Sequence, residues 1–183
     1  MLTPRNSGWI EVICGPMFSG KTEELIRRLV RSQYAKQKVT IFKPSVDNRY
    51  SEDYIVSHNQ RKIKSIIIKN TNEILELGKD SQVIGIDEAQ FCDKGLIDIV
   101  NSLAKSGKRI VIAGLDKDYM GKSFGPIKQL MVDAEYVSKV NAICMTCGDP
   151  ASFSQRISAE KDLVVVGETD KYEARCRKCF SPT

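Results

Sequence analysis

The sequence lacks several features that would have set its class at once. No apolar run approaches the roughly 20 residues that a membrane-spanning helix needs. The first residues, MLTPRNSGWIEVICG, show no basic segment followed by a long apolar stretch and a small-residue cleavage site, so we expect an unprocessed cytoplasmic protein. Histidine occurs once, as His58, and we interpret it as a structural or subunit-contact residue rather than a ligand.

Charge of one sign is not concentrated either. The formal net charge is +5, but no block of five like charges occurs. This balance suits an anionic ligand and is weak evidence for nucleic-acid binding. We therefore expect neither a nucleic acid nor a membrane as partner.

What is present fits a globular α/β protein. The 183 residues, 42% hydrophobic and 28% charged, suffice for one well-buried core and a small appendage. The predicted strands, rich in β-branched residues, lie at 9–14, 38–43, 65–69, 82–87 and 109–115. The helical patterns between them lie at 20–37, 72–79 and 94–107. Apolar strands that alternate with helices favour a parallel sheet covered on both faces.

The composition changes after about residue 140. The remaining segment carries four of the six cysteines and no clear helix, and its strand candidates are 137–144, 151–157 and 162–168. We place a domain boundary near Val140. This boundary gives a nucleotide-binding domain at 1–140 and a cysteine-rich domain at 141–183.

The segment GPMFSGKT fits the pattern G-x-x-x-x-G-K-[ST], with Gly15, Gly20, Lys21 and Thr22 at its fixed positions. It follows a predicted strand and begins a predicted helix, as a phosphate-binding loop requires. Backbone N–H groups of such a loop and of the helix N-terminus surround a phosphate. Lys21 adds positive charge for the β- and γ-phosphates, and the Thr22 hydroxyl can ligate Mg²⁺. The alternative is a glycine-rich turn that binds nothing.

Two adjacent carboxylates, Asp87 and Glu88, follow the apolar strand in VIGIDEAQF. An acid at such a strand end reaches the Mg²⁺ shell in P-loop proteins, which suits Asp87. Ligands bind beyond the carboxyl ends of parallel strands, so Glu88 could be the general base that takes a proton from an attacking hydroxyl. The alternative is a solvated loop, but a phosphate loop in the same chain favours function.

Cys144, Cys147, Cys176 and Cys179 form two C-x-x-C pairs that no histidine accompanies. Four thiolates can hold Zn²⁺ in a tetrahedron without an open position, so the pattern predicts a structural zinc site. The long segment between the pairs, 148–175, must leave the metal and return to it. Disulfides are the alternative, which a cytoplasmic location disfavours.

Several segments occur in one order between about Ile10 and Phe180: GPMFSGKT, DNRYS, DEAQF, GLD, FGP, both cysteine pairs and ETDKYEARCRKC. In this order they resemble the thymidine kinases of the zinc-containing cytosolic and bacterial type. The resemblance implies a P-loop (RecA-like) parallel-sheet domain with a small zinc-stapled lasso domain over the nucleoside. It also implies transfer of the γ-phosphate of ATP to the 5′-hydroxyl of thymidine or deoxyuridine, a homotetramer, and feedback inhibition by thymidine triphosphate (dTTP).

The resemblance further implies a role for each matching residue. Glu88 matches the catalytic base, and Asp87 supports the metal. ATP binding is implied for Gly15, Pro16, Met17, Phe18, Ser19, Gly20, Lys21, Thr22, Asp87, Glu88, Ala89 and Gln90. Nucleoside contacts are implied for Met17, Asp47, Arg49, Phe91, Leu115, Phe124, Val164, Val165, Val166, Gly167 and Tyr172. In KDYMGKSFGP this chain departs from the usual bacterial pattern at Tyr119, Met120 and Ser123.

Three other interpretations stay open from the residues alone. A nucleic-acid-binding P-loop ATPase with a zinc module is compatible with the charge and the cysteines, but the short chain and the lack of a basic stripe argue against it. A non-catalytic nucleotide-binding or interaction module would leave Glu88 without a role. A kinase of a different small acceptor shares the phosphate loop and the acids, and Phe91 and Phe124 could then be core residues.

Overall fold

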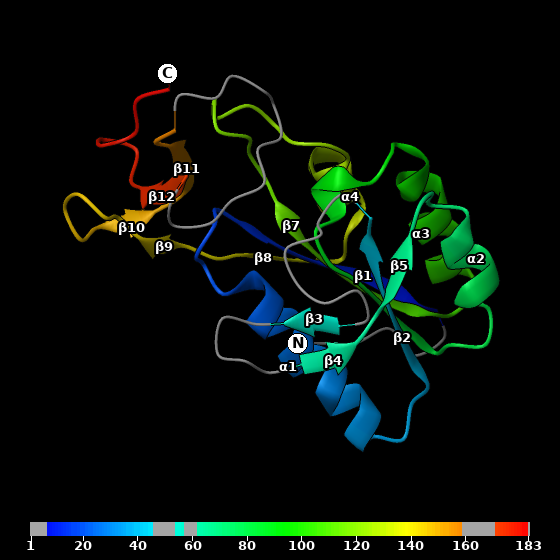
Figure 1. The fold of residues 1–183 in the computed structure, drawn as a ribbon. Coiled ribbons are helices and arrows are strands. Elements are labelled where there is room, and N and C mark those ends of the chain that lie inside the picture. The colour runs from blue at the N-terminus through cyan, green and yellow to red at the C-terminus, as the bar shows by residue number, and fades with distance from the viewer. Residues whose placement is uncertain (1–6, 46–53, 57–61, 159–170, 183) are drawn as a thin grey trace.

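The computed structural model describes residues 7–45, 54–56, 62–158 and 171–182, and Figure 1 shows their fold. Some predictions fall outside the described residues. They concern Asp47, Arg49, His58, the strand candidate 162–168 and, within it, Val164, Val165, Val166 and Gly167.

The centre of the fold is a six-stranded sheet in the order β5-β2-β6-β7-β1-β8, in which every neighbouring pair is parallel. Its strands are β1 (Trp9–Gly15), β2 (Val39–Pro44), β5 (Ile66–Ile68), β6 (Val83–Ile86), β7 (Arg109–Leu115) and β8 (Tyr136–Lys139). The first five are the strands expected from the sequence. The prediction of a parallel α/β fold is therefore confirmed.

Helices cover both faces of this sheet (Figure 1). They are α1 (Lys21–Tyr34), α2 (Glu73–Leu77), α3 (Gly95–Lys105) and α4 (Ile127–Asp133), with the 3-10 helix η1 (Ala89–Phe91) after β6. Since side chains alternate along a strand, Ile13 of β1 packs with Leu29 of α1, while Val12 packs in the cluster that contains Leu103 of α3. No described helix combines the length and the apolar character that a membrane span requires.

Four short strands gather beyond one end of the central sheet (Figure 1). Strands β9 (Ala142–Ile143) and β10 (Pro150–Ala151) pair antiparallel, as do β11 (Phe153–Arg156) and β12 (Tyr172–Arg175). A further antiparallel pair joins β3 (Tyr54–Val56) and β4 (Lys62–Lys64).

Two predicted strands are each divided in the structure. The segment 137–144 forms β8 in the central sheet and β9 in the small sheet, because the Val140 N–H makes the last bond to β1, at Cys14 O (2.8 Å). The segment 151–157 changes partner at Ser152, from β9 to β12. Helix α4 and the strands β3, β4 and β12 are elements that the sequence pattern does not predict.

The parallel direction of the strands decides where the functional residues meet. Strand β1 ends at Gly15, β6 at Ile86, β7 at Leu115 and β8 at Lys139. Their following segments all leave the same edge of the sheet, which is where ligands bind in open α/β folds. The phosphate loop and the acid pair are therefore close in space although far apart in sequence.

Candidate active site

The phosphate loop leads from β1 directly into α1. Gly20 is the N-cap of α1 at φ 78°, and within the described chain no side chain caps this helix. Its N-terminus is thus suited to receive an anion. The Lys21 ammonium is buried beside the loop and donates to Pro16 O (2.7 Å), which also accepts the Ser19 hydroxyl (2.8 Å). Burial lowers the pKa of Lys21, and the nearby charges of Glu88 and Asp87 oppose that shift.

The acid pair lies directly against the phosphate loop. The Thr22 hydroxyl donates to the Asp87 carboxylate at 3.2 Å, and the Glu88 N–H donates to the same carboxylate at 3.0 Å. Burial and the adjacent charge of Glu88 raise the pKa of Asp87 to about 7. A buried carboxylate beside a second one and a hydroxyl is a donor set that suits Mg²⁺. The predicted Mg²⁺ contacts, Thr22 and Asp87, are therefore neighbours in the structure.

Glu88 occupies the turn between β6 and η1. Its φ of 52° is left-handed, which is uncommon for a residue with a side chain and is enriched at functional sites. The Gln90 amide is buried and donates to the Glu88 carboxylate, while the side chain of Ala89 lies in the apolar cluster that includes α3. In the described part of the chain, the side chain of Gln90 therefore contacts Glu88, and that of Ala89 packs in the apolar core.

The predicted nucleoside residues include an aromatic pair. The rings of Phe91 and Phe124 meet edge to face, with centroids 5.6 Å apart and planes at 86°. Both rings are half-buried, as are Met17 and Leu115, whereas Tyr172 is buried in β12. The alternative interpretation, in which Phe91 and Phe124 are core residues, would require both rings to be fully buried. They are instead half-buried, at the edge of the sheet where ligands bind.

Two residues that the sequence does not mark, Ser154 and Arg156, connect the β11–β12 hairpin to the phosphate loop and to Tyr119. The Met17 N–H donates to the Ser154 hydroxyl at 2.9 Å. In the same hairpin the buried Arg156 guanidinium donates to the Tyr172 hydroxyl at 2.7 Å and lies over the Tyr119 ring, 3.6 Å from its centroid. The unusual Tyr119 is thus a packing partner of the hairpin. The other two departures from the bacterial pattern, Met120 and Ser123, are exposed.

A second connection starts at Asp116, which follows β7 and is buried. Its Oδ2 accepts from the ammonium groups of Lys117 (2.9 Å) and Lys139 (2.8 Å), and Lys117 also donates to Ser152 O (3.2 Å). Burial alone would raise the pKa of Asp116, but the two lysines outweigh it and hold that pKa below its usual value. The sequence signal for this residue, an acid directly after an apolar strand, is the one that marked Asp87.

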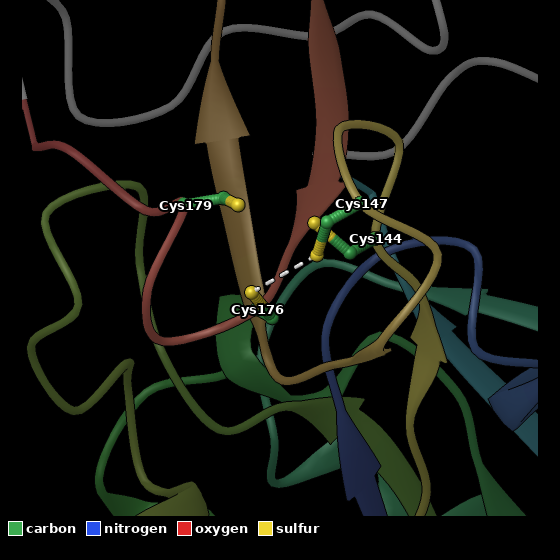
Figure 2. Close-up of side chains that lie close together, drawn as sticks. All are labelled: Cys144, Cys147, Cys176 and Cys179. Carbon is green, nitrogen blue, oxygen red and sulfur yellow. Dashed lines mark hydrogen bonds between the residues drawn. The ribbon is translucent and has the colours of Figure 1, made fainter.

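The four predicted zinc ligands come together in the cysteine-rich region, as Figure 2 shows. Cys144 and Cys147 lie in the turn between β9 and β10, and Cys176 and Cys179 follow β12. All four sulfurs lie within 4.8 Å of one another, and those of Cys147 and Cys176 are 3.6 Å apart. A tetrahedron with Zn–S bonds of about 2.3 Å separates its sulfurs by about 3.8 Å, so the donor set fits a metal ion of this kind.

The backbone around the cysteines has the form that such a site needs. The Gly148 N–H donates to Cys144 O, and the Phe180 N–H donates to Cys176 O, each at 2.9 Å, so both C-x-x-C segments are tight turns. Burial raises the pKa of Cys144, but backbone N–H groups from Cys176 and Cys147 outweigh that effect and bring it to about 6. These donors favour the thiolate of Cys144, which is the form that binds metal.

Comparison with known proteins gives consistent matches over almost the whole chain. The family model described as thymidine kinase matches residues 8–180. A protein named thymidine kinase from Rhodothermus sp. (strain ITI 518) is 54% identical over 175 residues, which cover 96% of this chain and 82% of that protein. Proteins of the same name from Bacteroides thetaiotaomicron and Bacteroides fragilis are 54% and 53% identical over 176 residues, which cover 96% of this chain and 88% of each relative.

Proposed function

Because the chain belongs to the thymidine kinase family, we propose that its site transfers the γ-phosphate of ATP to the 5′-hydroxyl of thymidine, with Glu88 as the general base. The class of enzyme follows from the family, and the role of each residue is what we propose. One observation carries these roles above all. The 3.2 Å contact between the Thr22 hydroxyl and the Asp87 carboxylate joins the phosphate loop and the acid pair in a single site.

We assign the triphosphate of ATP to the loop from Gly15 to Thr22. The backbone N–H groups of the loop and the N-terminus of α1 would surround the phosphates, and Lys21 would neutralise charge on the γ-phosphoryl oxygens. Thr22 and Asp87 would hold the Mg²⁺ that accompanies ATP, and the bound ion would further neutralise phosphate charge.

Glu88 is next to these ligands, at the end of the same strand. The 5′-oxygen of thymidine attacks the γ-phosphorus while the Glu88 carboxylate accepts the hydroxyl proton. The bond to the bridging oxygen breaks, and its electrons leave with ADP. No covalent intermediate with the protein is needed, so positioning and charge neutralisation account for catalysis.

We assign the thymine base to the apolar side of this edge. Phe91 and Phe124 form an aromatic wall, and Met17, Leu115 and Tyr172 complete the proposed pocket. The contacts of Asp47 and Arg49 with the sugar, and the hold of Val164, Val165, Val166 and Gly167 on the base, stay predictions. Acceptance of deoxyuridine is a further prediction.

The four cysteines would bind one structural Zn²⁺ per chain, since the site has four protein ligands and no place for a substrate. The homotetramer, feedback inhibition by dTTP and the cytoplasmic location stay predictions that the family resemblance supports.

The reaction is tested by phosphate transfer from ATP–Mg²⁺ with thymidine, deoxycytidine or single-stranded DNA added separately. We expect nucleoside monophosphate with thymidine. ATP hydrolysis that only DNA stimulates, without a nucleoside product, would instead support the rival nucleic-acid ATPase.

The same assay tests the proposed base through Glu88→Gln. This variant keeps a polar side chain but cannot accept the proton, so kcat should fall by a factor of about 10² to 10⁴ while ATP still binds. Glu76→Gln, on the exposed surface of α2, is the matched control and should retain full activity. An unchanged kcat in Glu88→Gln would remove that residue from the base role.

A further inference from the structure

Gln90 connects the ends of two neighbouring strands at the catalytic edge. It lies in η1, two residues after Glu88, and its side chain is 2% exposed. Its Nε2 donates to Glu88 Oε2 at 2.5 Å, and its Oε1 accepts the N–H of Leu115, the last residue of β7, at 2.9 Å. One buried amide therefore contacts both the proposed base and the backbone of the adjacent strand.

The Leu115 N–H decides which way this amide faces. A backbone N–H can only donate, so the group that meets it must be the amide oxygen of Gln90. The NH₂ group then has to face Glu88, where a carboxylate oxygen accepts it. The hydrogen bond from Leu115 of β7 therefore fixes the orientation in which the Gln90 amide donates to the Glu88 carboxylate.

Two glycines leave the space that this arrangement needs. A Cβ at Gly114 would lie 2.9 Å from Gln90 Oε1 and 2.6 Å from Ile127 Cδ1. A Cβ at Gly125, whose φ is +53°, would lie 2.1 Å from Gln90 O. Both distances to Gln90 are shorter than a Cβ contact normally allows, so the side chain and the backbone of Gln90 occupy a slot bounded by glycines.

We infer that Gln90 is a positioning residue, which holds the carboxylate of Glu88 in the orientation that accepts the proton of the 5′-hydroxyl. A glutamate side chain has several freely rotating bonds, and small errors in the placement of a reacting group lower rates strongly. The inference rests on the proposed role of Glu88. It gives Gln90 a function that acts through the base, where the family resemblance implied only a place in the ATP-binding motif.

The test uses Gln90→Met in the full chain, with thymidine and ATP–Mg²⁺ as substrates. Methionine has a similar volume but neither donates to Glu88 nor accepts from Leu115. We expect kcat to fall at least about tenfold, while the KM values for ATP and thymidine stay within about twofold, because neither substrate loses a direct contact. Gln82→Met is the matched control, since Gln82 lies at the other end of β6, where its Oε1 accepts the Lys38 N–H at 3.0 Å, and its loss should leave kcat unchanged.

The Glu88→Gln background separates positioning from a structural role. If Gln90 acts through Glu88, Gln90→Met should have little further effect on the residual rate of Glu88→Gln. An equal loss in both backgrounds, or a wild-type kcat in Gln90→Met, overturns the inference. A wild-type kcat in Glu88→Gln would instead overturn the proposed base.

Gln90→Glu keeps the test decisive if methionine disturbs folding, because glutamate has nearly the same shape. One of its oxygens can still accept the Leu115 N–H, but the other meets the Glu88 carboxylate, so the two carboxyl groups either repel each other or share one proton, and in both cases Glu88 is a poorer base at neutral pH. We expect kcat at neutral pH below that of the wild type, with the pH–rate profile displaced to higher pH because the paired carboxyl groups ionise less readily. Activity equal to the wild type would contradict the inference.

Discussion

The central sheet and the cysteine-rich strands β9–β12 are stabilised by different means. In the sheet, large apolar side chains such as Ile13 and Ile112 are fully buried against helices on either face. In the region β9–β12, the apolar cluster around the cysteines consists of Ala142, Ala151, Ala174, Cys144 and Cys176. The larger region is held by the burial of large apolar side chains. The cluster around the cysteines has only methyl groups and thiols, and the large apolar groups near it are the buried Tyr172 and the stacked rings of Phe153 and Phe180.

This difference determines how each region serves the reaction. Burial of apolar surface stabilises by roughly 25 cal/mol per Å², so a few alanine methyls contribute little, whereas structural zinc sites contribute about 10–16 kcal/mol in small peptides. The groups that we propose to bind phosphate and take the proton lie at the edge of the sheet, which is stabilised by apolar burial. Tyr172 and Ser154 lie on β12 and β11, next to the proposed metal site. We therefore expect metal loss to affect the nucleoside far more than ATP.

Of the changes considered, metal removal should produce the largest difference in stability between β9–β12 and the central sheet. We expect a strong chelator, or Cys176→Ser, to abolish thymidine phosphorylation because β9–β12 unfolds, while ATP binding and the central sheet persist. Hydrogen exchange measured by mass spectrometry should show lost protection at 142–156 and 172–176 and retained protection in β1, β6 and β7.

The control for metal removal is Cys92→Ser, because Cys92 lies outside the four-cysteine cluster and should leave metal content at about one ion per chain. Full protection of β9–β12 after the metal is removed would contradict the prediction. Loss of protection throughout the sheet would show that the two regions do not differ in the way we describe.

The parts of this molecule that could be predicted from sequence are those with short-range signals. The strands of the sheet are dense in β-branched residues, and the phosphate loop has a fixed spacing. The two C-x-x-C pairs likewise predict a single four-cysteine site. Acids after apolar strands mark Asp87 and Glu88, and Asp116 follows β7 in the same way.

Other parts depend on pairing between distant segments. The run 137–144 looks like a single strand, and its division follows from the position of Cys14, whose carbonyl makes the last bond to it. Helix α4 has two turns at most, so Ile127 and Leu130 show only one helical spacing. The hydrogen bond from Gln90 to Glu88 depends on the amide orientation set by Leu115, which is 25 residues from Gln90. No local pattern encodes such contacts.

Glu11 offers a way to weaken the central sheet alone. This residue of β1 is 3% exposed and pairs with Arg28 of α1 (2.9 Å) and Arg109 of β7 (2.7 Å). Removal of one member of a buried ion group leaves the others uncompensated, so Glu11→Gln should lower the free energy of unfolding by about 3 kcal/mol. Urea unfolding followed by circular dichroism measures this change. Glu24→Gln removes another acid that pairs with Arg28, but the Glu24 side chain is 24% exposed, so solvent screens the pair and its loss should cost less than about 1 kcal/mol.

The contribution of Glu11 should also depend on pH. Burial raises its pKa, but hydrogen bonds from Arg109 and Trp9 and the charges of both arginines outweigh this and lower it from the ordinary 4.5. A lowered pKa in the folded state means that the stabilisation is fully present above the unfolded pKa and is lost as the pH falls through the folded pKa. The stability difference between wild type and Glu11→Gln should therefore shrink in acid below about pH 4.5. A difference that grows in acid would contradict the assignment.

The smallest effect is expected at the connection between the two regions. Lys117 joins Asp116 to Ser152 O, and its side chain is 20% exposed, so Lys117→Met should lower the free energy of global unfolding by only about 1 kcal/mol. Its local effect should exceed its global one, because the lost bond to Ser152 lies between the sheet and β11. Lys139→Met is the matched control, since Lys139 donates to the same Asp116 Oδ2 at 2.8 Å from the end of β8. We expect faster hydrogen exchange in β11 and a higher KM for thymidine in Lys117→Met than in Lys139→Met. Equal behaviour of the two variants would show that the charge of the cluster, and not the link to Ser152, couples the strands β9–β12 to the central sheet.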